Sequence, residues 1–350
     1  MSEHGEDSDG EVEDAIVLMP GHELVTCCVF AGAQRGYVDG PIADARFHGP
    51  TALLQLSDGG LLVSDRHRLR KISADDVQQQ VSTIAGEDEG GHRDGAAAQA
   101  RFGAARGFLL LPDGRVLVAD CWNHRIRLLS ADLLEVSTVA GDGTQGHHDG
   151  AAAQARFYCP MGLALLPDGR VLVADCWNCR IRLLSADLQE VRTVAGDGTR
   201  AHRDGAAAQA RFNGPTGLAL LPDGRVLVAD CANHRIRLLS ADLLEVSTAA
   251  GDGTQGHRDG AAAKASLHLP RNLVVLRDGR VLVLTCQGVR VLSADFQQVH
   301  AVAPRGVNLW GAVQRFDGSV VISFCGGHLC VLDGFEARLT KRRRTCVTDT

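Results

Sequence analysis

The sequence predicts an all-β chain folded as one six-bladed β-propeller, with four antiparallel strands in each blade. Three observations support this class. The chain repeats itself with a period of about 55 residues, which is typical of propellers and solenoids. Each copy contains four short apolar or alternating runs separated by turns, the pattern of a β-meander. No copy contains the two segments of 3.6-residue period that a stacked helical repeat requires.

The repeats are clearest in the middle of the chain. Three segments are near copies of one another, and weaker copies flank them: 85–139, 140–194 and 195–249, with 31–84 before them and 250–303 after them. Each of the three carries H-x-D-G-A-A-A-Q-A-R-F, followed by a core close to L-L-P-D-G-R-V-L-V-A-D-C. Because the pattern recurs in register, each copy is expected to form the same unit.

One copy is enough to predict the strands of a blade. Residues 162–166 are apolar and end in a P-D-G turn, where glycine can adopt a positive φ. A second apolar run follows at 171–174. The segment 180–185 alternates charged and apolar residues, as a half-buried strand does. A fourth strand is expected at 191–194.

The number of such units predicts how the ring closes. Full blades are expected near 51–84, 106–139, 161–194, 216–249 and 271–303, and three more strands near 309–314, 319–324 and 328–332. The strand at 25–30 is expected to complete the sixth blade, because an open sheet edge would invite aggregation. The segment 335–339 is an alternative outer strand. The propeller is therefore assigned to 15–340, between an acidic disordered tail at 1–14 and a basic disordered tail at 341–350.

Composition limits the classes of function. The formal net charge of -6 argues against broad binding of nucleic acid through its phosphates. No run reaches the 18 or more apolar residues of a membrane span, and the acidic start is unlike a signal peptide. We therefore expect a cytoplasmic or nuclear monomer that has no membrane segment. In that compartment the 11 cysteines would be reduced.

The turn after the second strand resembles the NHL repeat. The residues that carry the resemblance are Asp120, Asn123, His124, Arg125 and Ile126, which recur as Asp230, Asn233, His234, Arg235 and Ile236; in the copy between them Cys179 replaces the histidine. The resemblance covers roughly 31–303 and implies a propeller. Propellers of this family occur in ubiquitin-ligase proteins, RNA-binding regulators, scaffold proteins and a zinc-dependent amidating lyase, so the resemblance leaves the activity open.

Long loops should gather on one rim of such a propeller. The turn after the second strand lies on the same rim as the link to the next blade, and the link at 141–160 is longer than connectivity needs. Asp149 is expected to cap a short helix there, with Phe157 as its anchor. We predict a non-catalytic protein-binding rim, such as one that recognises substrates in a ubiquitin-ligase or regulatory complex. Its candidate residues are Trp122, Asn123, His124, Trp177, Asn178, His234, His48, Tyr158, Asn213 and His268.

A metal-dependent lyase or lactonase is a second hypothesis. Residues expected at the channel mouth differ between blades, as a specific site requires: His48, Tyr158, Asn213 and His268, with Arg106, Met161, Arg271 and Asn272 nearby. They include only two histidines and no carboxylate, whereas a catalytic zinc usually has three protein ligands. His92, His147, His202 and His257 also recur beside aspartates, where a local hydrogen bond to the aspartate is expected. No catalytic residue, metal or cofactor is therefore predicted.

RNA binding and redox chemistry are two further hypotheses. Arg125 and Arg127, with their copies at 180–182 and 235–237, could bind RNA or could pair with aspartates of the blade. Cys176 and Cys179 form a C-x-x-C, but the first position is already explained by the repeat. Asp120 and its copies are expected to accept hydrogen bonds from the amides of the turn that follows.

Overall fold

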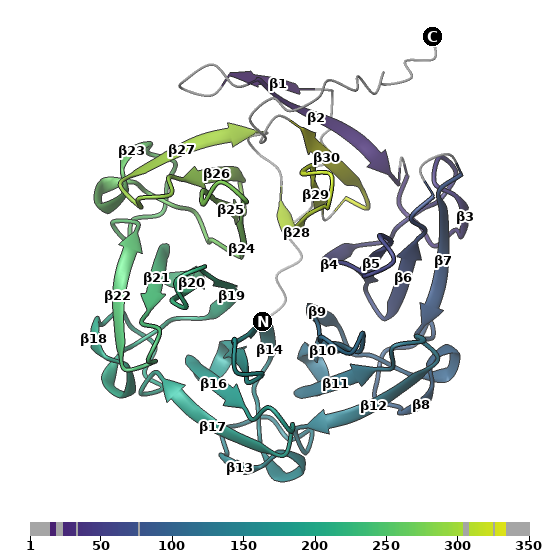
Figure 1. Cartoon of the computed structure of the whole chain (residues 1–350), viewed down its shortest axis with the longest axis horizontal. Coiled ribbons are helices and arrows are strands. Elements are labelled where there is room, and N and C mark those ends of the chain that lie inside the picture. The colour runs from purple at the N-terminus through teal and green to yellow at the C-terminus, as the bar shows by residue number, and fades with distance from the viewer. Residues whose placement is uncertain are drawn as a thin grey trace.

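The computed structural model describes residues 15–18, 24–32, 34–75, 78–303, 308–324 and 326–333. The tails predicted at 1–14 and 341–350 lie outside the described residues, and so does the alternative outer strand at 335–339. Six β-sheets stand around a central axis, with one strand of each sheet nearest the centre (Figure 1). The six-bladed propeller predicted from the sequence is confirmed.

Five blades follow one another along the chain. Blade 1 contains β3 (Gly40–Pro41), β4 (Pro50–Gln55), β5 (Leu61–Asp65), β6 (Arg68–Ile72) and β7 (Gln80–Ala85). Blade 2 contains β8 (Gly95–Ala96), β9 (Ala105–Leu110), β10 (Val116–Asp120), β11 (Arg125–Leu129) and β12 (Glu135–Ala140). Blade 3 contains β13 (Gly150–Ala151), β14 (Pro160–Leu165), β15 (Val171–Asp175), β16 (Arg180–Leu184) and β17 (Glu190–Ala195). Blade 4 contains β18 (Gly205–Ala206), β19 (Pro215–Leu220), β20 (Val226–Asp230), β21 (Arg235–Leu239) and β22 (Glu245–Ala250). Blade 5 contains β23 (Gly260–Ala261), β24 (Asn272–Val275), β25 (Val281–Thr285), β26 (Gly288–Leu292) and β27 (Gln298–Ala303).

The sixth blade joins both ends of the described chain. It contains β28 (Leu309–Gln314), β29 (Val320–Phe324) and β30 (Leu329–Asp333), followed outward by β2 (Leu24–Ala31) and β1 (Ala15–Leu18). Strands β2 and β30 are antiparallel, with Cys27 opposite Leu332. Closure by the N-terminal strand is confirmed, and the pairing removes an open edge at the end of the ring.

Each of blades 1 to 5 has a fifth strand in addition to the predicted four. This strand has two residues and comes from the long link between blades; in blade 3, Gly150 lies opposite Val191 of β17. A 3₁₀ turn, η3 (Ala152–Gln154), follows it in place of the predicted helix, and no side chain caps this turn. Asp149 instead accepts hydrogen bonds from Arg182 and Thr193, whereas Phe157 is fully buried as predicted.

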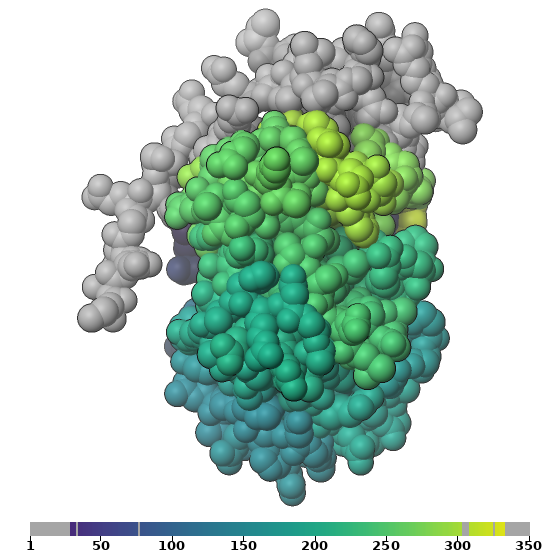
Figure 2. Space-filling model, turned by 90° about the vertical axis from the view of Figure 1, so that its left-hand side faces the viewer, coloured from purple at the N-terminus to yellow at the C-terminus, as the bar shows by residue number. Residues whose placement is uncertain are grey.

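Neighbouring blades pack face to face through their apolar side chains. One such cluster joins Leu172 of blade 3 to Val226 of blade 4, both fully buried. Figure 2 shows teal and green blades in contact along the side of the ring. Near the axis the inner strands approach even more closely, because a Cβ built on Gly107 would overlap the backbone oxygen of Met161 in the next blade. Glycine is required there for close approach of the backbones.

A buried arginine ties each long link to its blade. Arg127 is fully buried, and its guanidinium donates to Asp120 at 3.0 Å and to Asp94 at 2.5 Å. It also lies over the Phe102 ring, 5.1 Å from the ring centre. The same arrangement recurs around the fully buried Arg70, Arg182 and Arg237. Pairing with aspartates is thus confirmed for Arg127 and its copies, whose burial leaves them inaccessible to RNA. It is not found for Arg125, which is half-buried and donates to the backbone oxygens of Asn123 and Asp142.

The aspartate that ends the second strand holds a different segment from the one predicted. Asp120 accepts hydrogen bonds from the amides of Gly103 and Ala104, which precede the inner strand, at 2.8 and 3.2 Å. In the turn that follows, its hydrogen-bond donor is the side-chain amide of Asn123, at 2.7 Å. The expectation of hydrogen bonds from the backbone amides of that turn is wrong. This contact could not be predicted from the sequence, because residues 103–104 and Asp120 become neighbours only when the first two long strands of the blade pair.

Candidate protein-binding rim

The turn between the second and third strands places its tryptophan on the surface. In blades 2 and 3 it is a 3₁₀ turn, η2 (Cys121–Asn123) and η4 (Cys176–Asn178). The residue after each turn, His124 or Cys179, has a positive φ of 55° or 53°, which ends the turn and starts the third strand. Trp122 is consequently 54% exposed and Trp177 is 42% exposed.

The asparagines predicted for this rim hold the turn in place. The side-chain amide of Asn123 donates to the Asp120 carboxylate at 2.7 Å and to the backbone oxygen of Gly91 at 2.6 Å. Asn178 makes the equivalent two bonds, to Asp175 and Gly146. Both amide N–H groups are therefore used inside the blade, and the turn presents the tryptophan instead.

Four of the predicted residues meet at the junction between blades 2 and 3. We call Trp122, His124, Tyr158 and Trp177 the aromatic cluster. The Trp122 and Trp177 rings lie 6.2 Å apart in an edge-to-face arrangement, and Tyr158 lies 4.9 Å from Trp177. His124 packs edge-on against Tyr158 at 5.5 Å. Aromatic rings at such separations attract one another, which fixes their relative orientation.

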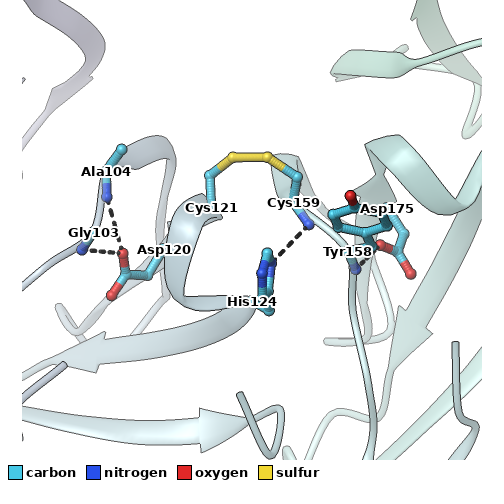
Figure 3. Close-up of a disulfide and its surroundings, with 8 residues drawn as sticks. All are labelled: Gly103, Ala104, Asp120, Cys121, His124, Tyr158, Cys159 and Asp175. Carbon is cyan, nitrogen blue, oxygen red and sulfur yellow. Dashed lines mark hydrogen bonds between the residues drawn. A yellow bond between two sulfur atoms is a disulfide. The ribbon is translucent and has the colours of Figure 1, made fainter. Parts of the chain in front are cut away.

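A disulfide adjoins the aromatic cluster, and Figure 3 shows it beside His124 and Tyr158. It joins Cys121 of blade 2 to Cys159 of blade 3, and each of these cysteines adjoins a residue of the cluster. The Cys159 amide donates to Nδ1 of His124 at 3.3 Å, and the Tyr158 amide donates to Asp175 at 2.8 Å. The cluster is thus attached on both sides to buried structure.

This disulfide corrects the expectation that all cysteines are reduced. Cys121 occupies a position that is cysteine in several copies, but Cys159 stands where the neighbouring copies have Ala104 and Gly214. The cysteine at 159 was therefore the feature of the sequence that could have indicated a disulfide. The Cys121–Cys159 pair was not predicted because the two cysteines belong to different blades.

The C-x-x-C in blade 3 lacks the features of a redox site. Cys176 and Cys179 are both buried and are not joined to each other. Burial raises the pKa of both thiols, which keeps them protonated at neutral pH. Reactive cysteines have the opposite property, a lowered pKa.

The remaining predicted rim residues make contacts of their own. His234 accepts a hydrogen bond from the Leu269 amide at 3.2 Å, and its ring lies 6.2 Å from that of His268. The backbone amide of Asn213 donates to the Asp230 carboxylate. The His48 ring packs on the Tyr37 ring, 5.0 Å away between ring centres. In the described part of the chain, no group of three or more His, Cys, Asp or Glu residues could hold a metal ion.

The recurring histidines of the links make local contacts, although with a different partner. Nε2 of His147 lies 2.8 Å from the Thr193 hydroxyl and 3.7 Å from Asp149. Burial and the nearby arginines lower the pKa of His147 to about 4. The distances show that the expected hydrogen bond to aspartate is replaced by one to threonine. The lowered pKa means that the His147 ring is neutral at pH 7.

The channel-mouth prediction divides into two groups. Arg106, Met161, Arg271 and Asn272 line a central cavity, as expected, whereas His48, Tyr158, Asn213 and His268 do not line it. Trp310 of blade 6 also lines the cavity and was not predicted. It stands directly before Gly311, just as Arg106 stands before Gly107, which is the signal that could have identified it.

Fold and repeat define the class as a six-bladed β-propeller, and comparisons with known proteins identify the repeat. The NHL-repeat family model matches residues 157–182 and 212–237. The NHL repeat-containing protein 2 of Gallus gallus is 30% identical over 137 residues, which cover 36% of this chain and 19% of that protein. The chain is an NHL-repeat β-propeller.

Further similar proteins differ widely in kind. Protein SUPPRESSOR OF QUENCHING 1, chloroplastic, of Arabidopsis thaliana is 27% identical over 274 residues, covering 72% of this chain and 25% of that protein. The chain thus spans a quarter or less of the length of these two relatives. A solved gluconolactonase from Xanthomonas campestris superposes with a TM-score of 0.60 at 14% identity, covering 92% of this chain and 95% of that one. That likeness shows the fold alone. Among the described residues, no helix has the length and apolar character needed to cross a membrane.

Proposed function

We propose that the chain is a non-catalytic protein-binding module whose binding surface is the aromatic cluster. The observation that carries the proposal is the pair of exposed tryptophans, Trp122 and Trp177, held edge to face at 6.2 Å by adjacent blades. Tryptophan and tyrosine are enriched among the residues that dominate binding energy at protein interfaces. The partner is expected to offer an apolar or arginine side chain, because both kinds pack on indole rings.

The rigidity of the cluster supports the same proposal. Its backbone is fixed by the Cys121–Cys159 disulfide and by the bonds of Asn123 and Asn178 to buried aspartates. Side chains that are already ordered lose less conformational entropy when a partner binds. Exposed aromatic side chains on a fixed backbone are suited to recognition.

Enzyme activity and RNA binding have less support. The cavity lining that the structure describes offers arginine, asparagine, methionine and tryptophan, which are not the usual ligands of a catalytic zinc. Arg127 and Arg182, which were candidates for RNA binding, are fully buried against carboxylates. Neither function is supported by an observation as specific as the aromatic cluster.

Affinity capture with matched variants tests the proposal. The double variant Trp122→Ala plus Trp177→Ala should lose the partner that the wild-type chain captures. A suitable control is Leu134→Ala plus Leu244→Ala, because both leucines are 65% exposed and lie in the turns that lead into β12 and β22, at the opposite rim. Retention of every partner by the tryptophan variant, or equal loss in the leucine variant, would refute the proposal.

A further inference from the structure

Blade 1 and the link before it place cationic side chains on the rim where blades 2 and 3 have the aromatic cluster. The turn between its second and third strands has two residues, Arg66 and His67, whereas the corresponding turn of blade 2 has four. The backbone amide of His48 donates to Asp65 at 2.9 Å, as the tyrosine of the aromatic cluster does to the aspartate of its own blade. The same position of the repeat therefore holds a histidine beside an arginine here.

Two arginines contact the two ring nitrogens of His48. Nε of Arg35 donates to Nδ1 at 3.1 Å and to the backbone oxygen of the same histidine at 2.9 Å. Nη1 of Arg66 lies 3.3 Å from the other ring nitrogen, Nε2. A guanidinium group has only hydrogen-bond donors, whereas a neutral imidazole has one donor nitrogen and one acceptor nitrogen. One ring N–H therefore faces an arginine N–H, and protonation of the ring would add a second such contact.

The ring proton of His48 lies on the side of Arg66. Burial lowers the pKa of His48, and the charges of Arg66 and Arg35 lower it further, so the ring is neutral at pH 7. Since Nδ1 accepts from Arg35, the single ring proton belongs to Nε2. Two donors, this N–H and the Arg66 guanidinium, thus point at each other. An anionic oxygen placed between them would accept a hydrogen bond from both.

The described part of the chain does not supply that oxygen. Arg35 and Arg66 are both exposed, and neither forms an ion pair with a described residue. The Asp65 carboxylate is fully buried, where it accepts from Arg70 and from the amides of residues 48–49. Its charge is therefore turned away from the exposed guanidinium groups.

Tyr37 adds a further polar group beside Arg66. The Arg66 guanidinium donates to the Tyr37 hydroxyl oxygen, which leaves the hydroxyl proton available to a ligand. The Tyr37 ring is held in place by His48, 5.0 Å away between ring centres, and by Arg68, whose guanidinium carbon lies 4.4 Å from the ring centre. Arg68 has a carboxylate partner, Asp88. Three side chains, those of Arg66, His48 and Tyr37, thus offer donors to one ligand.

We propose that this part of the rim binds a phosphate group between Nε2 of His48 and the guanidinium of Arg66. The phosphate oxygens would accept from both groups, which replaces a contact between two donors with two hydrogen bonds. Guanidinium groups match phosphate oxygens in charge and geometry. Arg66 is exposed and its described side-chain contacts are with His48 and Tyr37, so its long side chain is free to swing outward and admit the ligand.

NMR titration of the full chain tests this proposal, with inorganic phosphate and N-acetylphosphoserine amide as separate probes. The backbone amide signals of 35–37, 48–49 and 66 should shift saturably with at least one probe. Tighter binding of the phosphoserine compound would identify a phosphorylated protein as the source of the phosphate group, and tighter binding of inorganic phosphate a free phosphate compound. Absence of saturable shifts with both probes would overturn the proposal.

Matched variants separate this site from general charge effects. Arg66→Gln should weaken binding of the better probe by about tenfold or more, since a hydrogen bond to a charged group contributes about that much. His48→Phe keeps a ring beside Tyr37 but removes the N–H, and it should weaken binding in the same way. Arg115→Gln removes a charge from an exposed turn, where Arg115 pairs with Asp113, and should leave the affinity unchanged. Equal affinities of Arg66→Gln and the wild-type chain, or an equal loss in Arg115→Gln, would contradict the site.

Discussion

The junction between blades 2 and 3 differs from the junction between blades 3 and 4 in its surface and in one disulfide, while the hydrogen bonds and ion pairs that support the two turns are the same. Both have the aspartate that ends the second strand, the asparagine of the turn and the buried arginine. The aromatic cluster of the first junction, Trp122, His124, Tyr158 and Trp177, corresponds to Trp177, Cys179, Asn213 and Ala232 at the second. The first junction thus has four side chains with rings at these positions, and the second junction has one. The repeat therefore maintains the fold, and its departures from identity mark the candidate sites.

The largest expected effect tests whether the scaffold is equal at the two junctions. Arg127→Ala and Arg182→Ala each leave a fully buried aspartate, Asp120 or Asp175, without its cation. Removing one partner of a buried ion pair typically costs about 3–5 kcal/mol. Urea unfolding should show losses of that size in the free energy of unfolding, equal in the two variants. A loss confined to one variant would mean that the scaffolds differ.

The disulfide should give the second largest effect, and only at the first junction. Cys159→Gly restores the residue found at position 214 and suits the positive φ of 61° at position 159. The variant should lose about 2–4 kcal/mol of stability, the usual contribution of a disulfide. Reductant should destabilise the wild-type chain equally and leave the variant unaffected. Insensitivity of the wild-type chain to reductant would contradict the pairing.

A new disulfide should make the second junction resemble the first. A Cβ added at Gly214 would lie 3.8 Å from the sulfur of Cys176, and the φ of Gly214 is 65°, close to that of Cys159. Gly214→Cys should therefore pair with Cys176 and add about 1–2 kcal/mol, since engineered disulfides often deliver less than natural ones. Thiol titration of the denatured variant should find one reactive thiol fewer than in the wild-type chain. One reactive thiol more than in the wild-type chain would show that the new cysteine is unpaired and that positions 159 and 214 are not equivalent.

The smallest expected effect is a pH dependence shared by blades 2, 3 and 4. Burial lowers the pKa of His92, His147 and His202 below the ordinary value of 6.5, to about 4 for His147. The unfolded chain therefore binds more protons between pH 6.5 and 4 than the folded chain does. The stability that these rings contribute is complete above pH 6.5 and falls as the pH drops below that value, for His147 down to about pH 4. A triple His→Gln variant should lose less stability on acidification, and an unchanged pH profile would contradict this account.

Repetition explains what the sequence could predict. Strands, blade number and closure by 25–30 follow from a pattern that recurs in register, and several members of the aromatic cluster stand out as exposed aromatics on a repeat turn. Contacts between blades were not predictable in this way. The Cys121–Cys159 pair and the stacking of Arg106 on Trp310 join residues from different repeats, and periodicity within one copy does not indicate which copies face each other. Asp149 shows a related limit, because its partner Arg182 is 33 residues away.

Hydrogen–deuterium exchange of the chain, alone and with a captured partner, tests most directly whether the departures from the repeat form the binding site. Binding through the aromatic cluster should slow exchange at the backbone amides of 121–124, 158–159 and 176–178. The opposite-rim turns at 130–134 and 240–244 should exchange at unchanged rates. Protection of these opposite turns, with none around the cluster, would contradict the account.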